Sequence, residues 1–179
     1  MHKLASRRRP ARQRQRQPGR TPLTATHVAR GAVAGDAADI HALLSQFVED
    51  GLLLPRSLAE VESAVGKYVV VVDAHERVQA CASLVEYSPS LAEVASVAVA
   101  PEAQGLGLGS LAVRSVEAMA RRRAIGEVFA LSRAERFFES LGYDQAPLEL
   151  FPEKVARYAL LAERGVAVTP KACFRKALA

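Results

Sequence analysis

A glycine-rich stretch at residues 104–109, Gln-Gly-Leu-Gly-Leu-Gly, stands where an apolar strand pattern gives way to a helical one. Residues 94–99 are small or β-branched, and Pro101 ends that strand because proline cannot continue a central ladder. From Leu106 to Ile125, apolar residues recur every three or four positions, which predicts a helix that begins inside the glycines. The first N–H groups of a helix lack partners, and glycine lets a bulky anion approach them. The stretch therefore predicts a phosphate or pyrophosphate site.

Two common phosphate-binding loops do not fit this spacing. A P-loop has Lys and then Ser or Thr after its last glycine, whereas Gly109 is followed by Ser110 and Leu111. A dinucleotide-binding fingerprint has glycine or alanine at its sixth position and an acid at the end of the next strand, whereas Glu127 stands at that strand's start. A glycine-rich turn that only packs a helix against a sheet is the structural alternative.

The stretch follows the Val-x-Val-x-Pro of residues 97–101 and resembles the acyl-CoA-binding loop of the GNAT acetyltransferase family. Residues 137–143, Phe-Phe-Glu-Ser-Leu-Gly-Tyr, resemble a second motif of that family, which packs against the pantetheine and adenine end of the cofactor. The resemblance implies acetyl-CoA as the acetyl donor. The cofactor-binding residues that it implies are Val97, Val99, Gln104, Gly105, Leu106, Gly107, Leu108, Gly109, Ser110, Phe137 and Phe138.

Composition narrows the class of protein. The chain has 179 residues, half of them hydrophobic, which is enough for one domain with a core. No apolar run approaches the roughly 20 residues that span a bilayer, so we expect a soluble protein with no membrane partner. Cys81 and Cys173 suggest neither a disulfide framework nor a zinc site. We therefore expect reduced thiols in the cytoplasm, and no metal.

The basic residues are unevenly distributed. Eight of the 24 lie within residues 1–24, ahead of the first acid at Asp36, so the rest of the chain is mildly acidic although the whole carries a charge of +5. Residues 1–24 are rich in Arg, Gln and Pro, which predicts a disordered basic tail ahead of a domain at residues 25–179. Such a tail could contact nucleic acid or an anionic surface or act as a transit leader, and an extended start without function is the alternative. Apart from the tail, no nucleic-acid partner is expected.

The order of the predicted elements indicates an α/β fold, a central mixed sheet flanked by helices, and this order also matches the GNAT fold. Asp36 and Ser57 are the expected N-caps of the first two helices, the first of which ends at Gly51. The strand at 127–131 should run parallel to the strand at 92–99 because a helix connects them. Strands are expected at 27–33, 68–72, 78–86, 92–99, 127–131 and, at a sheet edge, 171–178; further helices at 134–141 and 151–164.

Acetyl transfer to an amine needs one group that accepts the ammonium proton and another that protonates the leaving thiolate. Strand alternation places Glu93 on the same face as Ala95 and Val97, where its carboxylate could relay a proton through water. An exposed acid at a strand start is the alternative. The tyrosine that many GNAT members use for the thiolate is replaced by Phe138. The nearest phenol is Tyr143, for which a core position is the alternative.

Four short stretches resemble the acetyltransferase module of N-acetylglutamate synthases, particularly the short forms without an amino-acid-kinase domain. They are Leu53–Ser57, Glu93–Ser96, Phe129–Ser132 and Pro152–Lys154. The resemblance implies four roles, which are Glu93 as base, Ser132 as acid for the thiolate, Arg56 as partner of a substrate carboxylate, and Lys154 as a second carboxylate partner.

The match departs after Ser132, where the family has a longer insert and this chain continues at once with Arg133. Each of the implied residues has a structural alternative. Arg56 would be a surface loop residue, Ser132 a helix N-cap, and Lys154 part of a solvated helix face.

We therefore expect a GNAT enzyme that transfers acetyl from acetyl-CoA to the α-amino group of a small amino acid. L-Glutamate is the first candidate, which would place the enzyme in arginine biosynthesis. A GNAT enzyme for another amine, such as a protein N-terminus, a polyamine or a xenobiotic, is favoured by the acidic body. A non-catalytic acyl-CoA sensor is the third option. The expected partner is a small-molecule amine or amino acid, and a homodimer is one assembly that the sequence leaves open.

Overall fold

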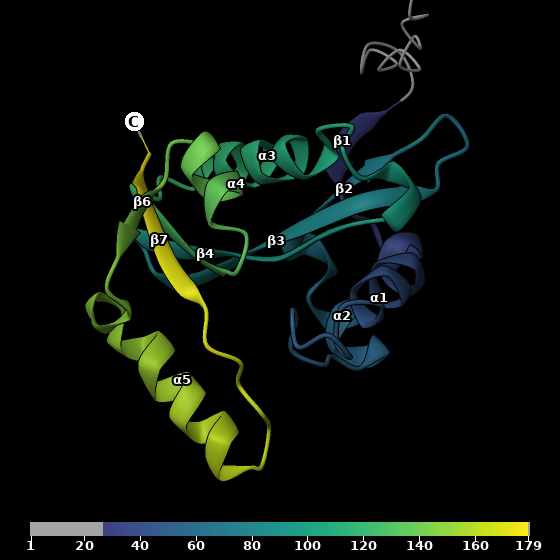
Figure 1. Cartoon of the computed structure of the whole chain (residues 1–179). Coiled ribbons are helices and arrows are strands. Elements are labelled where there is room, and N and C mark those ends of the chain that lie inside the picture. The colour runs from purple at the N-terminus through teal and green to yellow at the C-terminus, as the bar shows by residue number, and fades with distance from the viewer. Residues whose placement is uncertain (1–26, 179) are drawn as a thin grey trace, which may run out of the picture.

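Seven strands form one mixed, twisted sheet in the computed structural model, which describes residues 27–178 (Figure 1). Their order across the sheet is β1-β2-β3-β4-β5-β7-β6. Only β4 and β5 run parallel to each other, and every other neighbouring pair is antiparallel. The strands are β1 (Val28–Gly31), β2 (Tyr68–Val72), β3 (Val78–Ser88), β4 (Leu91–Val99), β5 (Glu127–Ser132), β6 (Asp144–Ala146) and β7 (Ala172–Ala177). The tail predicted for residues 1–24 lies outside the described residues.

Helices cover both faces of the sheet (Figure 1). The amphipathic helix α3 packs on β2, β3 and β4 from one side, and α1 packs on β3 and β4; Figure 1 shows α1 and α2 on the opposite face from α3. The helices are α1 (Ala37–Ser45), α2 (Leu58–Ser63), α3 (Leu108–Arg122), α4 (Glu135–Ser140) and α5 (Pro152–Glu163). The core between these layers includes all five residues of β2, which are fully buried, as their unbroken apolar pattern predicts.

The last strand differs from its predicted place. Residues 171–178 were expected at a sheet edge, but β7 lies between β5 and β6, and Cys173 and Phe174 are both buried. The edge is formed by β6, whose sequence Asp-Gln-Ala has no alternating apolar pattern and gave no strand signal. Strand β3 also continues to Ser88, through a segment predicted as loop. Strand β3 is longer than predicted because β3 and β4 form one antiparallel hairpin, in which pairing continues to Ser88 and Leu91.

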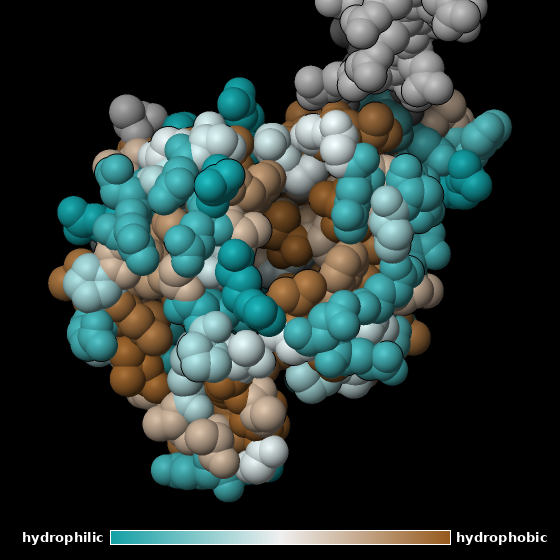
Figure 2. All heavy atoms as spheres, in the orientation of Figure 1, coloured by the Kyte–Doolittle hydropathy of each residue, from teal (hydrophilic) through white to brown (hydrophobic). Residues whose placement is uncertain are grey.

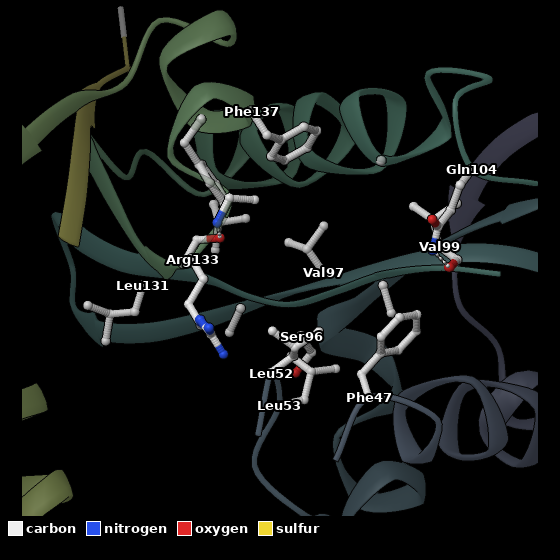
Figure 3. A pocket seen from close by; sticks show the side chains of 17 residues that line it. Phe47, Leu52, Leu53, Ser96, Val97, Val99, Gln104, Leu131, Arg133 and Phe137 are labelled. Carbon is white, nitrogen blue, oxygen red and sulfur yellow. Dashed lines mark hydrogen bonds between the residues drawn. The ribbon is translucent and has the colours of Figure 1, made fainter. Parts of the chain in front are cut away.

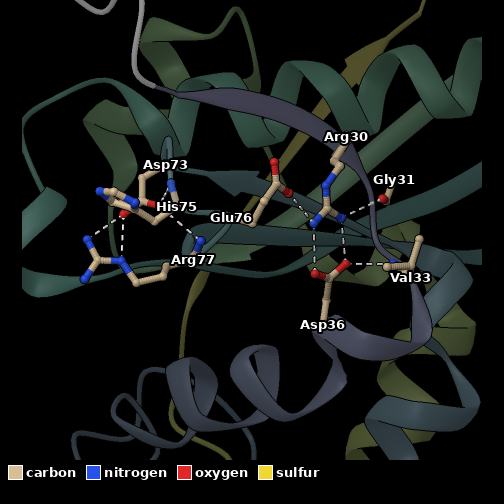
Figure 4. A network of polar contacts seen from close by, with 8 residues as sticks. All are labelled: Arg30, Gly31, Val33, Asp36, Asp73, His75, Glu76 and Arg77. Atoms are coloured by element: carbon tan, nitrogen blue, oxygen red, sulfur yellow. Dashed lines mark hydrogen bonds and ion pairs between the residues drawn. The ribbon is translucent and has the colours of Figure 1, made fainter.

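The start of α1 is held by an ion-pair network rather than by a side-chain cap (Figure 4). Asp36 stands at the predicted N-cap position, but a 3-10 turn (Ala34–Asp36) precedes the helix. The Asp36 carboxylate accepts the N–H of Val33 at 2.7 Å and pairs with Arg30 through both its oxygens, at 2.7 and 3.0 Å. Ser57 caps α2 as predicted, accepting the N–H of Glu60.

Candidate active site

The parallel strands β4 and β5 separate soon after they begin. Their ladder joins Leu91–Glu93 to Glu127–Phe129, and β4 then continues to Val99 without β5 beside it. A cavity of about 420 Å³ opens between the diverging strands, and Figure 2 shows a hollow on this face with hydrophobic residues inside it. The β4 backbone groups that face the gap can pair with an extended ligand that carries amide groups.

A β-bulge turns the side chains of β4 where they enter this cleft. Ala95 lies opposite Ser83 and Ala98 opposite Cys81, so β4 contains one more residue than β3 over this interval. Ser96 accommodates it with a φ of 53°, a strained value for a residue other than glycine. The extra residue reverses the alternation, and the prediction that Val97 shares a face with Glu93 is therefore wrong. Figure 3 shows Val97 on the side of Phe137, and Ser96 on the side of Leu52 and Leu53.

The glycine stretch forms the entry into α3 at one end of the cleft. Gly105 and Gly107 have φ values of 76° and 81°, in the left-handed region that favours glycine, and Gly107 is the N-cap of the helix. A Cβ on Gly109 would lie 3.2 Å from Val99 Cγ2 and 3.4 Å from Phe137 Cε2, so glycine permits this close approach. The N-terminus of this 15-residue helix is suited to an anion.

The predicted cofactor residues fall into two groups. Six line the cleft directly, namely Val97, Val99, Gln104, Gly109, Phe137 and Phe138. The other five, Gly105, Leu106, Gly107, Leu108 and Ser110, form the loop and the first turn of α3 beside it. Leu108 is itself buried in the core. This arrangement fits a ligand with a phosphate-bearing end and an extended amide-containing arm, and the individual binding roles stay predictions.

A smaller, charged cavity of about 60 Å³ adjoins the cleft. The two share four wall residues, Leu53, Ala95, Ser96 and Leu131. The charged side chains that line the smaller cavity are Arg56, Glu93, Lys154 and Lys171. The structure thus brings Arg56, Glu93 and Lys154 together from three distant stretches, as the sequence resemblance implies.

Glu93 and Lys154 form a buried ion pair. Lys154 Nζ lies 2.8 and 2.9 Å from the Glu93 oxygens, and the two residues are 5% and 4% exposed. The alternatives of an exposed acid for Glu93 and a solvated helix face for Lys154 are therefore wrong. Tyr87 donates its hydroxyl to Glu93 Oε2 at 3.0 Å. Burial lowers the pKa of Lys154, an effect that the Glu93 charge opposes, and burial followed by the Glu93 charge raises the pKa of Tyr87.

Two further residues of this cavity were not found from the sequence. Lys171 donates to the Leu52 carbonyl at 2.7 Å, and burial, followed by the charge of Lys154, lowers its pKa. The ring of Tyr158 lies 4.8 Å from Lys154 Nζ, a cation–π distance. A lone lysine ahead of a strand and a tyrosine in a helix carry no spacing signal. Arg56 is half-buried and forms no ion pair with any carboxylate of residues 27–178.

Ser132 and Tyr143 were the two candidate acids for the thiolate. Ser132 ends β5, lines the cleft, and accepts the N–H of Ala134 at 3.0 Å, which leaves its hydroxyl proton available to the cleft. Tyr143 is 2% exposed, packs 5.2 Å from the ring of Phe138, and lines neither cavity. Its geometry supports the core alternative. The described part of the chain contains no group of three or more His, Cys, Asp or Glu that could hold a metal ion.

Residues 40–143 match the acetyltransferase (GNAT) family. The chain belongs to the GNAT family. An uncharacterized N-acetyltransferase of Chlorobaculum tepidum is 31% identical over 128 residues, which are 72% of this chain and 82% of that protein. The amino-acid acetyltransferase of Pectobacterium atrosepticum is 31% identical over 127 residues, covering 70% of this chain and 29% of the relative. This GNAT chain thus spans less than a third of the amino-acid acetyltransferase that it matches.

Solved GNAT structures confirm the predicted fold and the predicted acetyl donor. N-Acetylglutamate synthase from Neisseria gonorrhoeae, complexed with coenzyme A and N-acetyl-glutamate, has a TM-score of 0.75 and 27% identity, covering 87% of this chain and 36% of that one. Rv2747 from Mycobacterium tuberculosis, in complex with CoA, has a TM-score of 0.74 and 25% identity, covering 85% and 99%. This GNAT domain is an acyltransferase that uses acetyl-CoA. Within residues 27–178, no helix has the length and apolarity to cross a membrane.

Proposed function

We propose that this GNAT domain acetylates the α-amino group of an acidic amino acid, with L-glutamate as the acceptor. The charge of the small cavity carries the proposal. Lys154 balances the one carboxylate there, Glu93, and Arg56 and Lys171 add positive charge beyond that pair. A dicarboxylic amino acid brings two negative charges and one ammonium group, which complements this set, whereas a polyamine would be repelled. The mild acidity of the rest of the chain acts at longer range and is screened by salt.

Each charged residue has a defined role in the proposal. The planar guanidinium of Arg56 holds one substrate carboxylate through two parallel hydrogen bonds. The ammonium groups of Lys154 and Lys171 face the same cavity and attract the second carboxylate. Held in this way, the acceptor nitrogen points toward the shared wall at Ala95 and Ser96, where the cleft and the cavity meet. Orientation of this kind replaces a bimolecular encounter and supplies much of the rate.

The acyl transfer then requires proton removal from the acceptor, attack on the thioester and protonation of the leaving thiolate. Glu93 accepts one proton from the acceptor ammonium group. The freed lone pair forms a bond to the thioester carbonyl carbon, and the carbon–sulfur bond breaks with its electron pair left on sulfur. The nitrogen releases its second proton to water as the amide forms. We assign the proton that the thiolate takes up to the Ser132 hydroxyl, which recovers its proton from solvent. No covalent enzyme intermediate is required, in keeping with the buried state of both cysteines.

The named relatives agree with this assignment at the level of chemistry. Several of the matched curated relatives are named amino-acid acetyltransferases, and a structural neighbour was solved with N-acetyl-glutamate. A place in arginine biosynthesis and a cytoplasmic location belong to the same proposal.

The test is the release of CoA from acetyl-CoA with a panel of acceptors. The panel contains L-glutamate, L-glutamine, L-aspartate and spermidine. We expect the highest kcat/KM with glutamate. Arg56→Ala should raise the KM for glutamate about 10- to 100-fold with a smaller change in kcat. The reason is that Arg56 would hold the substrate carboxylate equally in the bound substrate and in the transition state. Arg164→Ala is the matched control, since Arg164 is exposed and lines neither cavity.

Two results would contradict the proposal. Turnover confined to spermidine, and unaffected by Arg56→Ala, would keep the acetyltransferase and remove the glutamate assignment. Tight CoA binding without turnover of any acceptor would instead support the acyl-CoA sensor.

A further inference from the structure

A third cavity, of about 400 Å³, lies behind the acceptor site. It is lined by the segment between α1 and α2, by the segment between α5 and β7, and by Tyr158 of α5, and its walls are mostly apolar. Its volume falls within the range of cavities that hold small ligands. The acetyl transfer proposed above makes no use of it.

Leu53 is the one side chain of residues 27–178 that lines all three cavities. The two neighbouring leucines each line fewer cavities. Leu52 lines only the cleft, and Leu54 lines the two other cavities but not the cleft. Leu53 is therefore the wall that separates the cleft from the third cavity. Figure 3 shows it on the side of β4 where Ser96 points, at the edge of the cleft.

The acyl end of the donor belongs beside this wall. The phosphate-binding end of the cleft is at the start of α3, near Gln104 and Gly109. The opposite end is where the cleft shares Ala95, Ser96 and Leu131 with the acceptor cavity. Because the amine must reach the thioester carbonyl, the reacting carbon lies at this shared end, and Leu53 is part of it.

The segment that carries Leu53 is held in place by backbone contacts. The N–H groups of Leu52 and Leu53 both donate to the Phe47 carbonyl at 3.1 Å. The Lys171 ammonium group donates a further hydrogen bond to this segment, at the Leu52 carbonyl. These bonds hold the backbone of the segment from which the Leu53 side chain extends.

We propose that Leu53 restricts the donor to short acyl groups, and that the cavity behind it is an acyl chamber that a smaller residue at this position would open. The inference rests on the acyl transfer proposed above. The bonds made and broken are the same for every acyl group, since only the chain beyond the carbonyl carbon changes. An aliphatic chain of four to eight carbons is the ligand class that this apolar chamber would take.

The experiment measures CoA release from acetyl-, propionyl-, butyryl- and octanoyl-CoA with glutamate as the acceptor. For Leu53→Ala we expect the octanoyl-to-acetyl ratio of kcat/KM to rise at least about tenfold over the unmodified chain. Leu53→Val opens a smaller gap and should admit propionyl and butyryl groups only. Leu52→Ala and Leu54→Ala remove the same atoms on either side of the wall, and neither should change the ratio.

The outcomes separate this inference from the function on which it rests. If the unmodified chain already uses octanoyl-CoA as well as acetyl-CoA, Leu53 is no barrier and the inference is wrong. It is also wrong if Leu53→Ala and Leu53→Val keep acetyl turnover with glutamate but gain no longer donor. Absence of turnover with every donor in the unmodified chain overturns the proposed function instead. Should Leu53→Ala fail to fold, the propionyl and butyryl ratios of Leu53→Val decide the question.

Discussion

Lys154 Nζ lies 2.8 Å from Oε1 and 2.9 Å from Oε2 of Glu93, and water reaches almost none of either side chain. Glu93 is the third residue of β4 and Lys154 the third residue of α5, so the pair joins the central sheet to the C-terminal helix. Removing two charges from water costs several kcal/mol per ion before their attraction is counted. The pair also lines the smaller charged cavity, so this buried ion pair lies at the site of the proposed chemistry.

Glu93→Gln should lower kcat for acetyl transfer by about 10²-fold or more, because a positioned base contributes that much to proton transfer. The amide keeps the shape of the side chain and cannot take up the ammonium proton. Initial rates at saturating acetyl-CoA and glutamate measure the effect. Glu153→Gln is the control, since Glu153 is exposed on α5, next to Lys154. Equal rates for Glu93→Gln and the unmodified chain would remove Glu93 from the mechanism.

Lys154→Met should lower the free energy of unfolding by about 3–5 kcal/mol, because it leaves the Glu93 carboxylate buried without its partner. The double variant Glu93→Gln/Lys154→Met carries no buried charge at this position and should recover part of the loss. Urea denaturation of the three variants gives the coupling free energy. Losses that simply add would show that the two side chains do not stabilise each other.

Gly109→Ala should raise the KM for acetyl-CoA while the protein stays folded. The added methyl would sit 3.2 Å from Val99 Cγ2 and 3.4 Å from Phe137 Cε2, which are tight contacts with two residues that line the cleft. Either side chain must shift, and the shape of the donor site changes with it. Gly126→Ala is the control, because a Cβ there has no heavy atom within 4 Å. An unchanged KM in Gly109→Ala would place the donor elsewhere.

Ser132→Ala tests the two roles open to this hydroxyl. If Ser132 protonates the thiolate, kcat should fall about tenfold or more, by the usual worth of a positioned acid. Ala134 is the N-cap of α4, so Ser132 stabilises the turn before the helix. Loss of its bond to the Ala134 N–H should cost about 1 kcal/mol of unfolding free energy in either case. Ser132→Asn can still accept that N–H but has no acidic proton. Full activity in Ser132→Asn, with the stability restored, would leave Ser132 with the structural role alone.

Much of the fold is encoded in local patterns. The apolar residues of α3 recur with the helical period, and the glycine stretch marks where that helix begins. The short unbroken run of valines in β2 is typical of a buried strand because it is rich in β-branched residues. The parallel pairing of β4 and β5 follows from the helix between them. The edge strand β6 escapes such reasoning, since it is three residues long and is stabilised by pairing with β7 from the far end of the chain.

Three of the residues that line the smaller charged cavity could be named from the sequence, but their geometry could not. Glu93, Arg56 and Lys154 were named from short stretches, but no local pattern shows that Lys154 is buried against Glu93, because the contact spans 61 residues. The bulge at Ser96 is equally hidden. It depends on how β4 pairs with β3, and it reverses the face of Val97. Lys171 and Tyr158 enter the cavity only through the packing of the last helix and strand.

The network at Asp36 makes stability depend on pH at the acid end. Hydrogen bonds from Arg30, ahead of the Val33 N–H, lower the pKa of Asp36 below its usual 3.8 and outweigh the opposing effect of burial. Between the folded and unfolded pKa values, the unfolded chain binds more protons, so stability rises with pH there. The contribution of Asp36 is therefore complete above about pH 4 and is lost as the pH falls through the folded value.

Asp36→Asn should consequently lower the unfolding free energy by about 2 kcal/mol at pH 7, the usual worth of hydrogen bonds to a charged group. The difference from the unmodified chain should shrink as the pH is lowered below 4, because the carboxylate is then protonated first in the unfolded chain and, at lower pH, in the folded chain as well. Urea denaturation at a series of pH values from 7 to 3 measures this convergence. Asp39→Asn, at an exposed position in the first turn of α1, should cost less than about 1 kcal/mol. A difference for Asp36→Asn that is the same at pH 3 and pH 7 would show that the stabilisation does not depend on the charge of Asp36.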